Sequence, residues 1–358
     1  MSLLEDARKK INSIDKEMAR LFEERMHAVE LVAEHKRLHG LPILDKERET
    51  TIILKNSEYI ADKTIREYYV NYLKSNMDIS KQYQLRLMEG MKVAYCGTEG
   101  AFAHIATKKI FPTAQAVPYT DFQDTYTSVV SGECDAAVLP LENSYNGEVG
   151  QVTDLMFSGS LFVNNVMELA VTQDLLVLPD AKLENIKKVV SHPHALGQCA
   201  SYIKEHGFTI EEFSNTALAA KHIKEMNDPT IAAIASAEAA AVFGLKVIEH
   251  NINASRSNTT RFAVFTRSEN VRPTNEKEVH TIILFTVRNE AGALAKAIEI
   301  IGKHGFNMRS LRSRPMKELL WQYYFYVEAE GNVNSPDGKL MMTELRELCD
   351  KLRAVGTF

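Results

Sequence analysis

The spacing of apolar side chains changes along the chain, and its first segment has the pattern of helices. Over residues 1–89, apolar positions recur with the helical period of about 3.6 residues, and no strand pattern interrupts them. Ser2 followed by Glu5 is a capping-box pattern, which predicts that a helix starts here. Gly40 and Pro42 predict its end.

Two shorter helices are predicted to follow in the same segment. Asp45 is a suitable N-cap for a helix through about Asn56. Asp62 is a suitable N-cap for a third helix that ends near Gly90. Residues 1–90 are therefore predicted to form an all-helical domain.

From Met91 onward, short apolar runs alternate with helical patterns, which favours an α/β architecture over residues 91–267. The clearest predicted strands are Lys92–Gly97, Ala136–Pro140, Asp174–Leu178, Lys188–Ser191 and Arg261–Phe265. Residues 268–278 are polar, contain one proline and are predicted to be a linker.

The last segment, residues 279–358, has the pattern of a small βαββα unit with a short tail. Its predicted elements are a strand Thr281–Arg288, a helix Gly292–Lys303, strands Asn307–Arg314 and Trp321–Glu330, a helix Pro336–Leu352 and a short final stretch Val355–Phe358. The chain is thus predicted to contain three domains.

Composition and charge narrow the class of protein. The 358 residues are 45% apolar and 25% charged, which is ordinary for a globular protein and excludes disorder and collagen. A net charge of −5 disfavours a nucleic-acid binder. The four cysteines are far apart, so neither a zinc site nor a redox motif is indicated, and no metal or other cofactor is expected. With no membrane-spanning run and no signal-peptide pattern, a cytoplasmic protein is expected.

Basic residues fall on the apolar stripe of the first helix, at Arg8, Arg25 and Lys36. Such residues are costly on a packed face unless they are paired, so they indicate either ion pairs with another helix or a buried anion site. Arg25 and Lys36 lie roughly 16 Å apart along the axis and can converge on one ligand. Arg8 lies about 25 Å from Arg25, so it is expected to serve the site of a partner chain in an antiparallel dimer.

Polar residues also continue the stripe of the third helix. Ser80 and Gln84 share a face at i, i+4, although a frayed helix end would explain them as well. Asp45, Arg48 and Glu49 cluster at the start of the second helix, where capping alone accounts for Asp45.

These residues resemble the all-helical chorismate mutase family, whose domain is an intertwined helical dimer. The resemblance implies that Arg25, Arg48 and Arg8 of the partner chain bind the two carboxylates of chorismate. It also implies that Lys36 and Gln84 donate hydrogen bonds to the ether oxygen. By the same resemblance, Asp45 and Glu49 hold the hydroxyl region of the substrate, and Ser80 lies nearby.

Four polar clusters mark the α/β domain. Gly97–Phe102, Glu142–Ser144 and Ser191–Cys199 each follow a predicted strand, and Asn258–Phe262 precedes one. Ligands of open α/β folds gather at the carboxyl ends of strands, so the first three clusters are expected to line one site.

In this order the clusters resemble the prephenate dehydratase family, which has two α/β lobes similar to periplasmic binding proteins. The resemblance implies that Thr260 lies near the leaving hydroxyl, with Glu142 as the acid if burial favours its protonated form. Asn143, Ser144, Gln198 and Arg261 are expected to bind prephenate, and a structural ion pair is an equal alternative for Arg261. His192, beside Pro193, is expected to be a fold element rather than a ligand.

The last segment resembles the ACT domain, a ferredoxin-like βαββαβ fold that binds an effector. The resemblance implies a phenylalanine site at the turn Gly292, Ala293 and Leu294 and at Ser313, Arg314 and Pro315. The family usually has Glu-Ser-Arg-Pro at the second motif, whereas this chain has Arg312 in the first position, which reverses a charge.

The order of the three domains resembles bifunctional chorismate mutase/prephenate dehydratases of phenylalanine biosynthesis. The expected partners are chorismate, prephenate, phenylalanine as an inhibitor and a second copy of the chain in a homodimer or higher homo-oligomer, with no nucleic acid and no membrane. Two alternatives are a prephenate or arogenate dehydratase with a vestigial mutase, and a non-catalytic amino-acid sensor.

Overall fold

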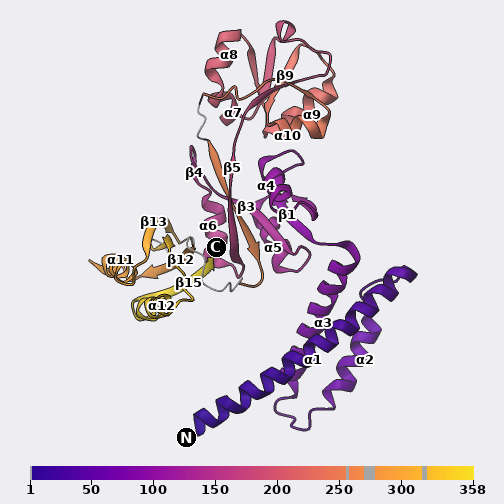
Figure 1. The fold of residues 1–358 in the computed structure, drawn as a ribbon, viewed down its shortest axis with the longest axis vertical. Coiled ribbons are helices and arrows are strands. Elements are labelled where there is room, and N and C mark those ends of the chain that lie inside the picture. Colours follow the sequence, from indigo (N-terminus) through magenta and orange to yellow (C-terminus); the bar gives the residue numbers. More distant parts are fainter. Residues whose placement is uncertain (1, 255–257, 270–278, 317–320) are drawn as a thin grey trace. The chain divides into compact units, whose positions relative to one another are not determined.

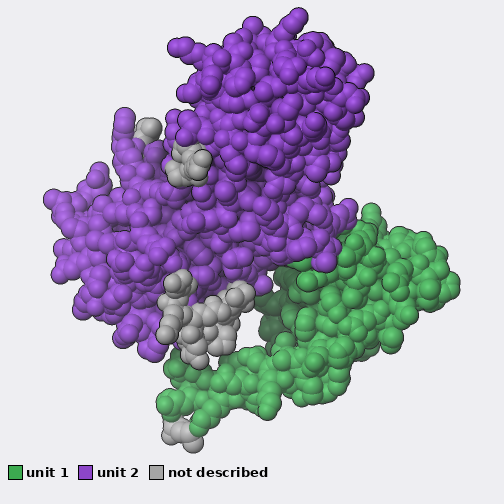
Figure 2. Space-filling view, turned by 45° about the horizontal axis from the view of Figure 1, so that its top comes forward, with its two compact units in different colours: residues 1–92 green, residues 93–358 purple. Residues whose placement is uncertain are grey.

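The computed structural model describes residues 2–254, 258–269, 279–316 and 321–358. It divides into two compact units, residues 1–92 and residues 93–358, which are coloured separately in Figure 2. The linker predicted at 268–278 lies almost wholly outside the described residues. No helix among the described residues is long and apolar enough to cross a membrane.

Three helices form the helical unit, residues 1–92. They are α1 Leu3–His39, α2 Lys46–Ser57 and α3 Arg66–Glu89. The predicted capping box is present, since the Ser2 hydroxyl accepts from Glu5 N and the Glu5 carboxylate accepts from Ser2 N. Gly40 ends α1 in the left-handed conformation, with φ 63°.

The sequence located the caps of α1 and α2 well but not the start of α3. Asp45 caps α2, accepting a hydrogen bond from Arg48 N at 2.9 Å, as predicted. Asp62 does not cap α3, which begins only at Arg66. Instead the Asp62 carboxylate accepts from Thr64 N and the Thr64 hydroxyl, so a local turn competes with the helix start.

Two lobes and a C-terminal module make up the second unit (Figure 1). The first lobe contains β1 Lys92–Cys96, α4 Phe102–Ile110, β2 Gln115–Tyr119, α5 Phe122–Val130, β3 Ala136–Asn143, β4 Gly147–Glu148, α6 Gly150–Ser158, β5 Phe162–Ala170 and β11 Thr259–Thr266. Its sheet has the order β2-β1-β3-β11-β5, with β4 paired to β3. β1 and β3 are parallel, whereas β11 runs antiparallel to both β3 and β5.

The second lobe is inserted between β5 and β11 of the first. It contains β6 Asp174–Val177, a 3₁₀ turn Leu183–Asn185, β7 Lys188–Ser191, α7 Pro193–Gln198, α8 Ala200–His206, β8 Thr209–Glu212, α9 Thr216–Met226, β9 Ile231–Ala235, α10 Ala237–Phe243 and β10 Lys246–Glu249. Its sheet has the order β10-β6-β9-β7-β8. Because the chain enters this lobe after β5 and leaves it before β11, two segments of the chain join the lobes.

The C-terminal module, residues 280–358, contains β12 His280–Val287, α11 Ala293–Lys303, β13 Asn307–Pro315, β14 Tyr323–Glu330, α12 Pro336–Leu348 and β15 Cys349–Thr357. Its antiparallel sheet has the order β13-β14-β12-β15. Two predictions were wrong here. The second helix ends at Leu348, not Leu352, and the final strand is nine residues long rather than a short tail.

Alternation of side chains gives the C-terminal sheet two buried faces. Ile282, Leu284 and Tyr326 belong to one core with residues of the first lobe, whereas Ile283 and Phe285 pack with α11 and α12. At Gly356, a Cβ atom would lie 1.9 Å from the carbonyl oxygen of Val163, so only glycine allows β15 to approach β5 this closely. The C-terminal module and the first lobe therefore share a continuous core.

Candidate functional sites

A polar cluster lies between α1 and α3 of the helical unit. The Arg25 guanidinium donates to the Ser80 hydroxyl and approaches the Asn76 carbonyl oxygen at 3.5 Å. Ser80 and Gln84 are 4% and 7% exposed, and Gln84 Oε1 has no hydrogen-bond partner among the described residues. Burial lowers the pKa of Arg25 from its ordinary value. A buried amide without a partner beside a half-buried guanidinium suits the binding of a polar, anionic ligand.

The other predicted mutase residues surround the α1–α2 connection or lie on exposed surface. Lys36 Nζ donates to the carbonyl oxygen of Ile43 at 2.6 Å, so the lysine faces the loop that leads to Asp45. Glu49 pairs with Lys81 of α3 at 2.9 Å. Arg48 and Arg8 are exposed. The structure thus brings Arg25, Ser80 and Gln84 into one helix interface, and it leaves Arg8 at the exposed start of α1.

A chain of hydrogen-bonded amides connects the two lobes of the second unit. Asn143 Nδ2 donates to Thr260 Oγ1 at 2.9 Å and to Asn258 Oδ1 at 2.8 Å. Asn258 Nδ2 donates to Gln198 Oε1 at 3.2 Å, and Gln173 Nε2 reaches the same oxygen at 3.4 Å. Three of the clusters found in the sequence therefore contribute to one network.

The orientation of the Asn143 amide is fixed by its other contacts. Asn143 Oδ1 accepts from the backbone N–H groups of Tyr145 and Asn146, at 3.0 and 2.9 Å. Its Nδ2 must therefore be the donor toward Thr260, whose oxygen is the acceptor. This leaves the hydroxyl proton of Thr260 available for a further acceptor.

Some details of these clusters differ from the prediction. Glu142 and Asn143 are the last residues of β3, not the loop after it, and Thr260 lies within β11. Gln198 is the last residue of α7. Ser144 is held by β11, because its hydroxyl accepts from Thr259 N at 2.9 Å. Asn258 and Gln173, 5% and 3% exposed, were not predicted as site residues.

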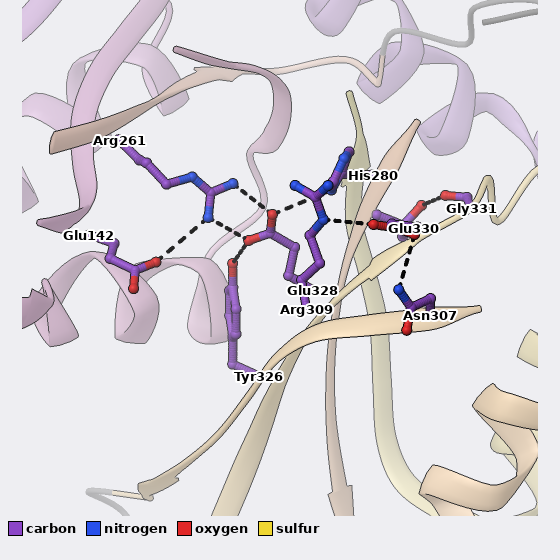
Figure 3. Close-up of polar contacts among 10 residues, drawn as sticks. Glu142, Arg261, His280, Asn307, Arg309, Tyr326, Glu328, Glu330 and Gly331 are labelled. Atoms are coloured by element: carbon purple, nitrogen blue, oxygen red, sulfur yellow. Dashed lines mark hydrogen bonds and ion pairs between the residues drawn. The ribbon is translucent and has the colours of Figure 1, made fainter. Parts of the chain in front are cut away.

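Arg261 and Glu142 lie in a network of charges (Figure 3). Arg261 forms a two-pronged ion pair with Glu328 of β14, at 2.9 and 2.6 Å, and lies 3.6 Å from Glu142. Glu328 is 1% exposed, and burial alone would raise its pKa, but the Arg261 partner outweighs burial and lowers it. Arg261 therefore forms a structural ion pair, which was the alternative to its predicted role in binding prephenate.

Glu142 is also paired to the C-terminal module. Arg312 Nη2 lies 2.7 Å from Glu142 Oε1, and the Glu142 side chain is 28% exposed. Two guanidinium groups therefore hold Glu142 in ion pairs, Arg261 from β11 and Arg312 from β13. The acid role of Glu142 was expected only on condition of burial, and its side chain is partly exposed.

Two further predicted features are a turn of the first lobe and a histidine of the second lobe. The Gly97–Phe102 turn leads from β1 into α4, and Gly100 N donates to His104 Nδ1 at 3.2 Å. Burial lowers the pKa of His104. His192 caps α7 by accepting from His194 N, which agrees with its expected role in the fold. Among the described residues, no three His, Cys, Asp or Glu side chains are grouped so that they could hold a metal ion.

The predicted effector residues fall into two separate places. Gly292, with φ 84°, precedes Ala293 and Leu294 at the start of α11, and Leu294 lines a cavity of about 510 Å³ with Asn289 and Glu290. Ser313, Arg314 and Pro315 lie on β13. The Arg314 guanidinium points to the first lobe, where it pairs with Asp154 at 2.9 Å and Glu148 at 2.6 Å. The structure does not bring Arg314 to the Gly292 turn.

The structure thus consists of a helical unit, a two-lobed α/β region and a C-terminal α/β module. Residues 7–85 match the family "Chorismate mutase type II", and residues 93–270 match "Prephenate dehydratase". A bifunctional chorismate mutase/prephenate dehydratase of Aquifex aeolicus is 32% identical over 100% of this chain and 98% of its own length.

Solved structures resemble about three quarters of this chain. The prephenate dehydratase of Arthrobacter aurescens in complex with L-Phe has a TM-score of 0.69 and 26% identity, covering 75% of this chain and 89% of its own. GqqA, described as a quorum quenching acylase, has a TM-score of 0.69 and 28% identity, covering 74% of this chain and 97% of its own. One fold thus accommodates different chemistries, so activity is assigned from the whole-chain relatives.

The chain belongs to the family of bifunctional chorismate mutase/prephenate dehydratases. It is an enzyme that rearranges chorismate to prephenate and converts prephenate to phenylpyruvate. The alternatives of a vestigial mutase and of a non-catalytic sensor are thereby set aside.

Proposed function

We propose that the two reactions take place at the two polar clusters described above and that phenylalanine bound to the C-terminal module inhibits the second reaction. The hydrogen-bonded chain Thr260–Asn143–Asn258–Gln198 is the observation that carries the dehydratase part. The proposed domains are residues 1–90 for the mutase, 91–267 for the dehydratase and 279–358 for an ACT domain. A cytoplasmic location stays a prediction.

The mutase reaction needs no nucleophile and no cofactor, because it is a unimolecular rearrangement. The site must select a compact conformer of chorismate and stabilise negative charge that develops on the ether oxygen. We assign the carboxylates to Arg25, Arg48 and Arg8 of a second chain, and the ether oxygen to Lys36 and Gln84. Ser80, Asp45 and Glu49 hold the hydroxyl region of the substrate in this proposal.

A homodimer is proposed because the apolar stripe on the first half of α1 is uncovered in the single chain. Ile11, Ile14, Met18 and Phe22 are 55%, 49%, 42% and 39% exposed, whereas Val29 and Ala33 are buried. A contiguous apolar stripe of this kind favours burial against a partner. A second copy that covers it would also bring its own Arg8 to the site.

Mixing two inactive variants tests this shared site. Arg8→Ala and Arg25→Ala are each expected to lose mutase activity as homodimers. In a heterodimer, one site has both arginines and the other has neither. Because about half of the dimers in a random mixture are heterodimers, the mixture should recover about a quarter of wild-type mutase activity. Recovery is measured as chorismate consumption at fixed total protein. A mixture as inactive as its components would show that Arg8 and Arg25 act in the same chain.

The dehydratase reaction needs a proton for its leaving group. The ring C–OH bond breaks and the leaving hydroxide becomes water, while the ring C–carboxylate bond breaks to release CO2 and leaves its electron pair in the aromatic ring. In this proposal the Thr260 hydroxyl donates a hydrogen bond to the leaving hydroxyl. The Thr260 oxygen already accepts a hydrogen bond from Asn143 Nδ2. Asn143, Ser144 and Gln198 orient the substrate.

The effector proposal depends on the cavity next to the Gly292 turn. The N-terminus of α11 provides backbone N–H groups for the carboxylate of an amino acid. The cavity beside it is lined by Phe325, Tyr323 and Leu294, which suit an aromatic side chain. The relative solved with L-Phe supports phenylalanine as the ligand.

One coupled assay tests these assignments together. With chorismate as the only substrate, purified protein should form phenylpyruvate, and L-phenylalanine should lower this product while prephenate accumulates. D-phenylalanine is the matched control and should have little effect. Prephenate as the only product under both conditions would contradict the dehydratase assignment. Arogenate offered in place of prephenate determines which of the two the second site prefers.

A further inference from the structure

Arg312 of the C-terminal module contacts the first lobe of the second unit. Its Nη2 lies 2.7 Å from Glu142 Oε1 and its Nη1 lies 3.7 Å from Glu148 Oε2. Glu142 and Glu148 face each other across the β3–β4 pair. Like charges directly opposite each other destabilise a sheet, so one guanidinium between them stabilises this hairpin.

The direction of Arg312 follows from the geometry of its strand. Arg312 and Arg314 are two residues apart on β13 and therefore share the face that looks toward the first lobe. The Arg312 guanidinium lies 5.4 Å from the centre of the Tyr326 ring, which belongs to the core shared with that lobe. Burial alone would lower the pKa of Arg312, but the hydrogen bond from its guanidinium to Glu142 and the nearby charges outweigh burial and raise it.

Glu142 is directly linked to the residues that hold Thr260. In the β3–β11 pair, Glu142 lies opposite Arg261 and Asn143 lies opposite Thr260. Arg261 is already held by the buried Glu328, so Arg312 provides the shortest cationic contact to Glu142. A displacement of Glu142 would therefore move the backbone next to the Asn143–Thr260 hydrogen bond.

We propose that Arg312 is a positioning residue of the dehydratase site, supplied by the C-terminal module. It fixes Glu142 and the β3–β4 hairpin, and through them the Asn143 amide that orients the Thr260 hydroxyl. The inference rests on the dehydratase site proposed above. It gives this position a structural role in the dehydratase site, whereas the reversed charge alone would be expected to alter only the response to phenylalanine.

The charge-reversed variant distinguishes these two roles. Arg312→Glu restores the residue type usual in the family, so an effector role predicts unchanged kcat and an altered response to phenylalanine. The positioning role predicts a lower kcat, because Glu142, Glu148 and the new carboxylate would repel one another. We expect at least about a tenfold fall in kcat for prephenate, with a change in KM of no more than about twofold.

Three companion variants make the test specific. Arg312→Lys keeps the charge and should retain kcat within about threefold, whereas Arg312→Gln should show most of the loss. Arg309→Ala is the matched control, because Arg309 is an exposed arginine on the same strand whose partner is Glu330. It should leave kcat unchanged. Loss of the thermal unfolding transition of the second unit would show that Arg312→Glu does not fold. In that case the comparison of the Lys and Gln variants decides the test.

Wild-type kcat in Arg312→Gln and Arg312→Glu would overturn the inference, as would equal losses in the Lys and Gln variants. Failure of the proposed function would look different, because the unmodified enzyme would then not convert prephenate at all.

Discussion

Replacing Lys36 by alanine is expected to lower kcat of the mutase reaction by about 10²–10³-fold, which is typical when one preorganised donor is removed from a developing oxyanion. Lys36 is the only ammonium group assigned to the ether oxygen, where charge builds up in the transition state rather than in bound chorismate. The loss should therefore be in kcat, with a smaller change in KM. The measurement is chorismate consumption at saturating substrate.

The second activity of the same chain serves as the control. Conversion of added prephenate should stay at the wild-type rate, because Lys36 belongs to the helical unit. Lys46→Ala, an exposed lysine at the start of α2, should leave both activities unchanged. Because Lys36 also donates to the Ile43 carbonyl, circular dichroism must show that the helices persist. A mutase rate within about threefold of wild type would exclude Lys36 as the donor.

Local signals in the sequence predicted the helical unit because its helix boundaries depend on neighbouring residues. Ser2, Glu5 and Gly40 cap α1 through contacts within a few residues of the helix ends, and such contacts are encoded locally. Asp62 misled the prediction because its carboxylate has an alternative local partner in Thr64. Propensity alone does not decide which of two local hydrogen-bonding patterns forms.

The final strand could not be predicted from local pattern. The sequence over residues 336–352 has the pattern of a helix, which predicts that the helix continues to Leu352. In the structure Leu352 lies in β15 opposite Phe285 of β12. This pairing joins segments more than sixty residues apart in the chain, and such tertiary contacts override intrinsic preference.

The sequence motifs predicted most residues of the proposed dehydratase site, but not all of the residues that hold them in place. Asn143, Gln198 and Thr260 were expected near prephenate, and they do lie in one hydrogen-bonded network. Gln173 carried no motif, because a single glutamine between two strands has no distinctive spacing. The Arg312–Glu142 contact depends on how β13 pairs in its sheet and how that sheet packs on the first lobe, and neither is encoded near Arg312.

Replacing Thr260 by valine is expected to reduce dehydratase kcat by about 10²–10³-fold while the mutase stays active. Valine keeps the branched shape that β11 accommodates, so the change removes the hydroxyl with little change in volume. It deletes the donor to the leaving group and also leaves Asn143 Nδ2 without one of its acceptors. Incubated with chorismate, the variant should accumulate prephenate, which quantitative product analysis detects directly.

The control for this variant is Thr266→Val, at the other end of the same strand, where the hydroxyl donates to Ser268 O. It removes an equivalent hydroxyl far from Asn143 and should retain kcat. Thr260→Ser restores the hydroxyl without the methyl group and should recover most of the activity, because the donor rather than the shape is the catalytic element. If serine and valine reduced kcat equally, packing in β11 would explain the effect, and the proton for the leaving hydroxide would have to come from a group other than Thr260.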